Sequence, residues 1–257
     1  MNHTPLEEPI KLFWTGGWDS TFRLLQIVLA ERNLVQPYYI LDRTRLSFAI
    51  ELKTMEKIRD LFYLNYPFSK PLILPTIFAE LSDLQEDQEI SDAYFLSNNK
   101  KKLGIQYEWL ARFCKENRIS DMELCLERKR NPNDQRFAPF LKKVDHSTSF
   151  IFDPKLIDTS EYTLFKYYRF PIYGLTKIET EKIAKKMGWM RILKETWFCH
   201  TPIHGKIPCG TCAPCKIVIS EKLGWRVPLY IRILNALSLT KPTRLLIHNI
   251  LVKFNRG

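Results

Sequence analysis

Short apolar runs and longer amphipathic segments alternate along the first third of the chain. Residues 10–15 and 37–41 are apolar runs typical of buried strands. Between and after them, residues 19–32 and 48–63 carry apolar side chains at helical spacing. We therefore expect the chain to begin with strand, helix, strand and helix.

The same alternation continues toward the C-terminus. We predict strands at residues 72–78, 122–126 and 149–152, and helices at residues 105–116 and 176–187. Thr176 can cap the last helix, Glu179 completes a capping box, and Gly188 is placed to end it. The segments 98–102 and 128–133 are predicted to be exposed loops.

This order of elements predicts an α/β fold with a doubly wound parallel sheet whose two faces are covered by helices. In such sheets ligands bind at the carboxyl ends of the strands, so the loop after the first strand is the first candidate site. We expect three parts: an α/β domain over residues 1–190, a small cysteine-rich subdomain over 191–225, and a basic amphipathic C-terminal extension over 226–257.

Composition narrows the class of protein. A chain of 257 residues with 45% hydrophobic and 26% charged residues is typical of a globular protein, which excludes intrinsic disorder, collagen and coiled coil as descriptions of the whole. No run approaches the roughly 18 apolar residues of a membrane span. The first ten residues include Glu7 and Glu8 and lack an apolar signal core. We therefore expect a cytoplasmic protein.

The formal net charge of +11 is unevenly distributed. Residues 217–257 contain seven Lys and Arg residues and one acid, Glu221, so this segment alone carries +6. A local excess of this kind favours a docking surface or a few residues that handle phosphate groups. A solvated helix face explains it equally well.

The loop after the first predicted strand has the composition of an anion-binding turn. It reads Thr15-Gly16-Gly17-Trp18-Asp19-Ser20. Two glycines allow the backbone to approach a ligand, and the helix that follows directs its N-terminal amides toward the same place. The spacing matches neither a Walker A loop nor GxGxxG. A plain tight turn with an N-cap is the alternative; the hydroxyl and acidic residues around the glycines favour phosphate.

Four of the six cysteines lie within seventeen residues, at Cys199, Cys209, Cys212 and Cys215. Four thiolates at this spacing can surround Zn²⁺ as a tetrahedron, and His200 or His204 can replace one of them. A reactive cysteine pair would not need the third and fourth cysteine. A full shell of four cysteines leaves no open position, so we expect a structural metal and not a catalytic one.

The glycine loop resembles the pyrophosphate-binding loop of the adenine-nucleotide alpha-hydrolase superfamily, usually written Ser-Gly-Gly-x-Asp-Ser; Thr15 keeps the hydroxyl of its first position. The resemblance implies that ATP is split between its alpha and beta phosphates and that AMP is attached to a substrate oxygen. Thr15, Gly16, Gly17, Trp18, Asp19 and Ser20 would then bind the pyrophosphate. Mg²⁺ would neutralise its charge.

The second half of the chain resembles the 7-cyano-7-deazaguanine synthase family. The similarity is carried by residues 171–179, Ala184, Gly188, residues 196–199 and the three later cysteines, and with gaps it runs from about residue 11 to 223. The family's Arg-Asn signature before the central helix is not evident here. Instead, residues 104–109 precede that helix.

The family resemblance implies a specific reaction. ATP adenylates the carboxylate of 7-carboxy-7-deazaguanine, ammonia displaces AMP to give an amide, and a second ATP drives the amide to a nitrile, a step toward queuosine. Asp19, Ser20 and Lys177 are then the catalytic candidates, with Lys177 near the alpha phosphate. Asp42, at the end of the second strand, would contact the adenosine; a loop-capping role is equally compatible.

Other functions remain open from the sequence. Some relatives of this family are found in antiviral operons and transfer the deazaguanine acyl group to a protein amine, and the basic extension can dock such a protein. A non-catalytic module that binds protein or nucleic acid is the rival from another class. We also expect a homo-oligomer.

Overall fold

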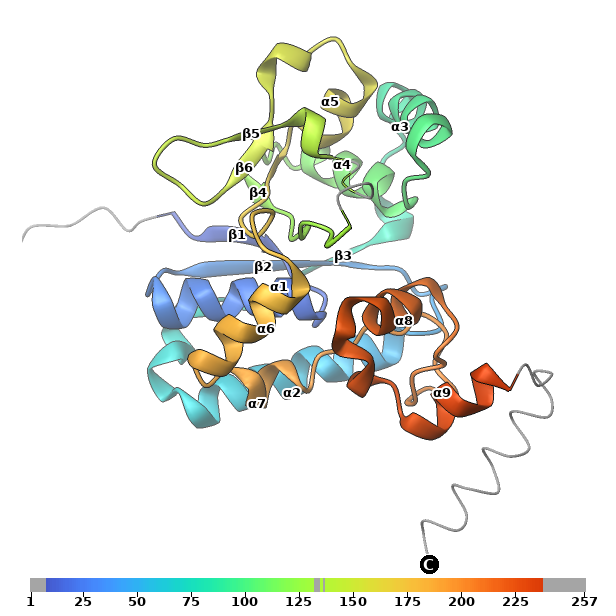
Figure 1. Ribbon diagram of the computed structural model, residues 1–257. Helices are drawn as coiled ribbons and strands as arrows, with labels where there is room; N and C mark the ends of the chain where they lie inside the picture. Colours follow the sequence, from blue (N-terminus) through green and yellow to red (C-terminus); the bar gives the residue numbers. More distant parts are fainter. Residues whose placement is uncertain (1–7, 132–134, 136, 238–257) are drawn as a thin grey trace, which may run out of the picture. The chain divides into compact units, whose positions relative to one another are not determined.

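The structure is a computed structural model that describes residues 8–131, 135 and 137–237 (Figure 1). Its centre is a five-stranded sheet with the order β3-β2-β1-β4-β7. The strands are β1 (Ile10–Phe13), β2 (Val35–Leu41), β3 (Ile77–Glu80), β4 (Met122–Glu123) and β7 (Tyr168–Arg169). Every neighbouring pair is parallel, which confirms the predicted α/β class and the parallel sheet.

The strand order changes direction at β1. Strands β2 and β3 follow on one side of β1, whereas β4 and β7 lie on the other. In register, Ile10 of β1 is opposite Val35 of β2, and Leu12 is opposite Glu123 of β4. At such a switch point the chain leaves neighbouring strands in opposite directions, and the crevice between the two loops is where open α/β sheets bind ligands.

Helices lie on both faces of the sheet (Figure 1). One face carries α1 (Trp18–Leu25), which continues as the π-helix η1 (Gln26–Ala30), together with α2 (Phe48–Asn65), α6 (Lys177–Lys186) and α7 (Met190–Leu193). The other carries α3 (Gln88–Lys101), α4 (Gln106–Glu116) and α5 (Ser160–Phe165). On that second face Phe13, Phe113 and Phe165 belong to one apolar core. Burial of this core is the main driving force for this half of the fold.

Shorter elements complete this part of the chain. The strands β5 (Leu141–Lys143) and β6 (Phe150–Phe152) form an antiparallel hairpin. The 3₁₀-helices are η2 (Pro67–Leu72), η3 (Leu81–Asp83), η5 (Ala138–Phe140) and η6 (Pro154–Leu156). No helix within residues 8–131 and 137–237 is long and apolar enough to cross a membrane.

The chain divides into two compact units. Within the described residues, the main unit comprises residues 8–44 and 51–197 apart from the gaps at 132–134 and 136, and the cysteine unit comprises residues 45–50 and 198–237. In the cysteine unit the described elements are α8 (Ala213–Val218), the π-helix η7 (Ile219–Leu223), the 3₁₀-helix η8 (Gly224–Arg226) and α9 (Leu229–Ala236). This division can be compared with the three predicted parts. Residues 191–197, expected in the cysteine-rich subdomain, group with the α/β unit, and residues 226–237, expected in the extension, group with the cysteines. Residues 238–257 of the predicted extension lie outside the described part.

Three predicted segments differ from the structure. The strand expected at 122–126 spans only Met122 and Glu123. The strand expected at 72–78 begins only at Ile77, because Pro71 lies within η2 and Pro75 removes another amide donor just before the strand. The loop expected at 98–102 is wrong, since α3 continues to Lys101. Its polar sequence looks like a loop, but Ser97 is buried and its hydroxyl donates to Ser160 Oγ at 3.0 Å, so tertiary packing extends the helix.

Candidate functional site

The loop after β1 has a backbone that requires glycine at its first turn. Gly16 has φ of 68°, and a Cβ there would lie 3.1 Å from Met55 Cγ and 3.2 Å from Thr54 Cγ2. The Gly16 carbonyl accepts a hydrogen bond from the Trp197 amide at 3.0 Å, which fixes the loop from a segment far along the chain. The glycine predicted to let a ligand approach therefore also lets the loop pack closely on α2.

The next residues start helix α1. Gly17 is its N-cap residue, with φ −76° and ψ 166°. Since glycine has no side chain, no capping hydrogen bond occupies the first amides of the helix from this position. Ser20 is buried in the first turn, and its Oγ accepts a long bond of 3.5 Å from the Thr15 amide. The first amides of a helix have no acceptor within the helix, so this turn presents donors and a partial positive charge to an anion.

Trp14 and Trp18, on either side of the glycines, are anchored in the core of the main unit. Trp18 is buried and its Nε1 donates to Thr180 Oγ1 of α6 at 3.0 Å. Trp14 is fully buried and its Nε1 donates to Thr21 Oγ1 at 3.0 Å. Their rings therefore hold β1, α1 and α6 together. What Trp18 offers to a ligand is its backbone.

Lys177, the first residue of α6, brings two acidic side chains together. Its Nζ lies 2.7 and 2.6 Å from the two carboxylate oxygens of Asp19, and 2.5 Å from Glu127 Oε2. The side chains of Lys177 and Glu127 are only 7% and 5% exposed, and that of Asp19 is 27% exposed. The predicted residues Asp19 and Lys177, 158 positions apart, thus meet at one place.

Glu127 was not identified from the sequence. It follows β4, the neighbour of β1 at the switch point, and its second oxygen Oε1 lies 2.9 Å from Lys129 Nζ. Nothing in its local motif marks it, because its neighbours Arg128 and Lys129 make the segment look like an exposed charged loop. The available signal was topological: an acid just beyond a predicted strand belongs at the carboxyl edge of a parallel sheet.

The three charges alter each other's protonation. Burial, and then the nearby Glu127 carboxylate, raises the pKa of Asp19 to about 6, although Lys177 acts in the opposite direction. Burial alone would raise the pKa of Glu127, but Lys177 and Lys129 outweigh it and the pKa is lowered. Burial disfavours protonated Lys177, yet Asp19 and Glu127 raise its pKa. At neutral pH the cluster holds two carboxylates around one ammonium.

The helix that supplies Lys177 begins with the predicted capping box. Thr176 Oγ1 accepts from the Glu179 amide at 3.3 Å, and Glu179 Oε2 accepts from the Thr176 amide at 2.8 Å. Gly188 has φ of 74° just beyond the last turn. The cap fixes where α6 starts, and thereby where the Lys177 side chain enters the cluster.

Asp42, the predicted adenosine contact, caps its own loop. Its Oδ1 accepts from the Thr44 amide at 3.0 Å and from Thr44 Oγ1 at 2.5 Å. This is the capping alternative raised from the sequence. One carboxylate oxygen is used in the cap, and contact of Asp42 with a nucleotide stays a prediction.

The four clustered cysteines form a second candidate site, within the cysteine unit. The Sγ atoms of Cys199, Cys209, Cys212 and Cys215 all lie within 4.8 Å of one another. Two of the separations are 3.9 Å, between Cys209 and Cys215, and 3.8 Å, between Cys212 and Cys199. A tetrahedron of sulfurs about 2.3 Å from a central Zn²⁺ has edges of about 3.8 Å. The arrangement can therefore hold a metal such as zinc.

Backbone amides surround the cysteine sulfurs. The Cys209 amide lies 3.2 Å from Cys199 Sγ, and the amides of Thr211 and Cys212 lie 3.4 and 3.3 Å from Cys209 Sγ. N–H donors of this kind stabilise thiolate charge and orient metal ligands. Asn235 of α9 adds a bond from its Nδ2 to the Cys209 carbonyl at 3.2 Å, which ties α9 to the cluster.

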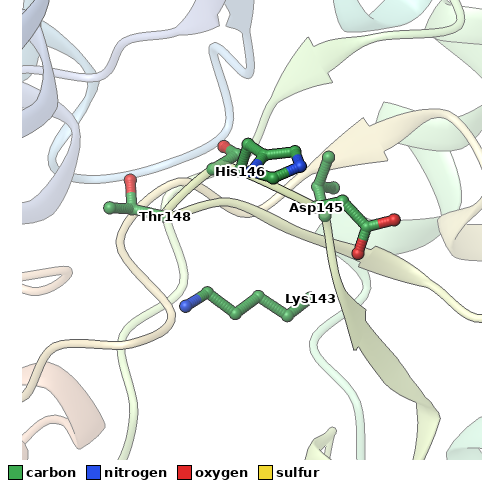
Figure 2. A pocket seen from close by; sticks show the side chains of 6 residues that line it. Lys143, Asp145, His146 and Thr148 are labelled. Atoms are coloured by element: carbon green, nitrogen blue, oxygen red, sulfur yellow. The ribbon is translucent and has the colours of Figure 1, made fainter.

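The remaining cysteines and the open hollow at the β5–β6 turn do not join these sites. Burial raises the pKa of the Cys114 and Cys125 thiols, so both stay neutral. The hollow is formed by residues 143–148 of a single turn and includes none of the residues of the two candidate sites (Figure 2).

Comparison with protein-family models, with curated proteins and with solved structures found no significant match to this chain.

Proposed function

We propose that the main unit is an ATP-dependent, AMP-forming ligase of the kind that the sequence resembles. The observation that carries the proposal is the meeting of Asp19, from the glycine loop, with Lys177, from a helix 158 residues later, beside the switch point of a parallel sheet. Both residues are implied by the family resemblance, Asp19 by the glycine loop and Lys177 by a motif far along the chain, and a turn with only a structural role needs no buried lysine beside it.

In the proposed reaction the loop amides and the N-terminus of α1 bind the pyrophosphate of ATP. Lys177 then stabilises the negative charge that develops on the alpha phosphate while a substrate carboxylate attacks it. The loop also orients the nucleotide for this attack. No protein general base is required, because a carboxylate is already ionised at neutral pH.

The acidic residues Asp19 and Glu127 supply oxygen donors suited to Mg²⁺, which prefers carboxylates and phosphates. Mg²⁺ would supply charge neutralisation for the pyrophosphate. Lys177 forms ion pairs with both carboxylates around it. Nucleotide binding must therefore loosen at least one of these ion pairs before Lys177 can serve a phosphate.

The proposed substrate is 7-carboxy-7-deazaguanine with ammonia as the acceptor, as the family resemblance implies. Transfer of the activated acyl group to a protein amine is the close alternative. In either case the four cysteines bind zinc with a structural role, since four thiolates complete the tetrahedral shell.

Incubation with ATP, Mg²⁺ and 7-carboxy-7-deazaguanine, with and without ammonium, tests the proposal. We expect AMP and pyrophosphate in amounts that match a new amide or nitrile product identified by mass. Lys177→Met should lower AMP formation at least about 100-fold. Lys182→Met, an exposed lysine on the same helix, is the control and should remain active. Formation of ADP, or full activity of Lys177→Met, would contradict the proposal.

A further inference from the structure

Among the described residues, the positive charge is concentrated in the cysteine unit. Residues 45–50 and 198–237 contain six Lys and Arg residues and a single acid, a formal charge of +5 on a small part of the chain. The described residues of the main unit, which are far more numerous, carry only +3. Even with four metal-bound thiolates, which together with Zn²⁺ contribute −2, the described cysteine unit keeps a charge of about +3.

The single acid of this unit does not offset the charge at the surface. Glu221 is buried, only 9% exposed. The lysines Lys206, Lys216 and Lys222 are exposed, and neither Lys216 nor Lys222 pairs with an acid among the described residues. The described surface of the cysteine unit therefore presents basic groups without acidic ones, which is a pattern complementary to a polyanionic partner.

The cysteine unit also exposes large apolar side chains at helical spacing. Leu229 and Ile233 lie four residues apart on α9 and Leu237 follows at the helix end; they are 62%, 50% and 61% exposed. The opposite side of α9 buries Ile231 and Leu234 in the unit. Helix α9 is therefore apolar on both sides, so only one of its two apolar faces is used by the fold.

Further exposed apolar residues stand beside the basic ones. Trp225, which is 45% exposed, comes three residues after the exposed Lys222. Ile217 follows Lys216 directly, and Ile219 comes three residues after Lys216. Aliphatic side chains and a tryptophan, interleaved with lysines, are the composition of an interfacial segment that inserts into lipid headgroups. Nucleic-acid surfaces instead use polar and planar side chains to contact phosphates and bases.

We propose that the cysteine unit docks on an anionic lipid surface, with Leu229, Ile233 and Trp225 entering the headgroup region and Lys216 and Lys222 contacting the lipid phosphates. Charge complementarity favours this occupant: neutral lipid would not require the +5 charge of the described residues, and an acidic partner without an apolar layer would leave the α9 face exposed. The proposal is independent of the ligase chemistry of the main unit.

Vesicle co-sedimentation of the full-length, metal-loaded protein tests this inference. We expect binding to vesicles of phosphatidylcholine with about 30% phosphatidylserine, little binding to pure phosphatidylcholine, and loss of binding as salt rises from about 0.05 to 0.5 M. Leu229→Ser with Ile233→Ser should weaken binding at least about tenfold, as should Lys216→Gln with Lys222→Gln.

Matched variants in the main unit provide the controls. Leu64→Ser with Ile157→Ser removes side chains that are 69% and 63% exposed, and should leave vesicle binding unchanged. Unchanged circular dichroism and metal content must accompany each loss of binding.

Four outcomes would overturn the proposal: no binding to anionic vesicles, equal loss of binding in the control variant, binding to a duplex DNA or RNA but not to vesicles, and a self-association that depends on Leu229 and Ile233 without vesicle binding.

Discussion

Lys177 is a buried cation whose two carboxylate partners, Asp19 and Glu127, come from different loops. If it is replaced by Met, the two carboxylates lose the buried ammonium between them, and among the described residues only Glu127 keeps a cationic partner, Lys129. We expect Lys177→Met to lower the free energy of unfolding by about 3–5 kcal/mol. Urea denaturation at neutral pH measures this, with Lys182→Met as the exposed control. A Lys177→Met protein as stable as the parent would mean that this ion cluster does not support the fold.

Asp19 gives the cluster a pH dependence. Its pKa is raised to about 6 from an ordinary value of 3.8, so between these values the native state binds more protons at this site than the unfolded state does. The contribution of Asp19 to the free energy of unfolding is therefore largest below about pH 4, and it is lost as pH rises through 6. Asp19→Asn should flatten this part of the curve when unfolding free energy is measured from pH 4 to 7. A decline with pH that is identical in both proteins would refute the assigned pKa.

The residues of this cluster show what can be predicted from a sequence at this scale. The position of Asp19 and the glycines could be predicted because a local motif places them between a strand and a helix. Lys177 was predicted from the family resemblance of residues 171–179, at the start of a capped helix. Glu127 was missed because its role depends only on the order of strands in the sheet, and that order is fixed by contacts between residues far apart along the chain.

At the scale of elements, the turn between Cys209 and Cys212 depends on one glycine. Gly210 has φ of 74°, and a Cβ there would lie 2.4 Å from Asn235 Nδ2 and 2.8 Å from Ile231 Cγ2. Gly210→Ala should therefore push α9 away from the cysteine turn and lower stability by more than about 2 kcal/mol.

Gly205→Ala is the matched control for this prediction. Gly205 has a similar φ of 71°, but a Cβ there would meet nothing within 4 Å. Its replacement should cost only the backbone strain, about 1–2 kcal/mol. Thermal unfolding followed together with metal content compares the two variants; equal losses would show that the contact with α9 is unimportant.

Elements with a strong local signal were predicted well. The capping box of α6 and the helical spacing of α2 are properties of neighbouring residues, and both elements form where expected. Helix α3 was missed at its C-terminal end because its polar residues, Asn98 to Lys101, resemble a loop when packing is ignored. Its helical state depends on α5, which contributes Ser160 from more than sixty positions later.

For the whole molecule, two compact units predict two responses to loss of metal. The cysteine unit has few strands or long helices, and its four sulfurs converge on one point, so a bound metal should provide much of its stability. Removal of the metal by a chelator should make residues 198–237 sensitive to protease while the sheet of the main unit stays protected. Limited proteolysis with mass spectrometry reads out both units in one experiment.

The cysteine variants give a sharper form of this prediction. Cys209→Ser should lower the metal content well below one ion per chain and reproduce the effect of the chelator. Cys125→Ala, which changes a cysteine outside the cluster, should keep the metal. A Cys209→Ser protein that retains a full metal complement would contradict a metal centre formed by the four cysteines.

The hydrogen bond from Trp197 to Gly16 has a consequence for the newly synthesised chain. The glycine loop leaves the ribosome first, but its partners Glu127, Lys177 and Trp197 follow more than a hundred residues later. A nascent chain that carries only the loop therefore lacks the charged cluster and the Trp197 contact. The proposed nucleotide site would form late, once the last of these partners has emerged and has packed against the loop.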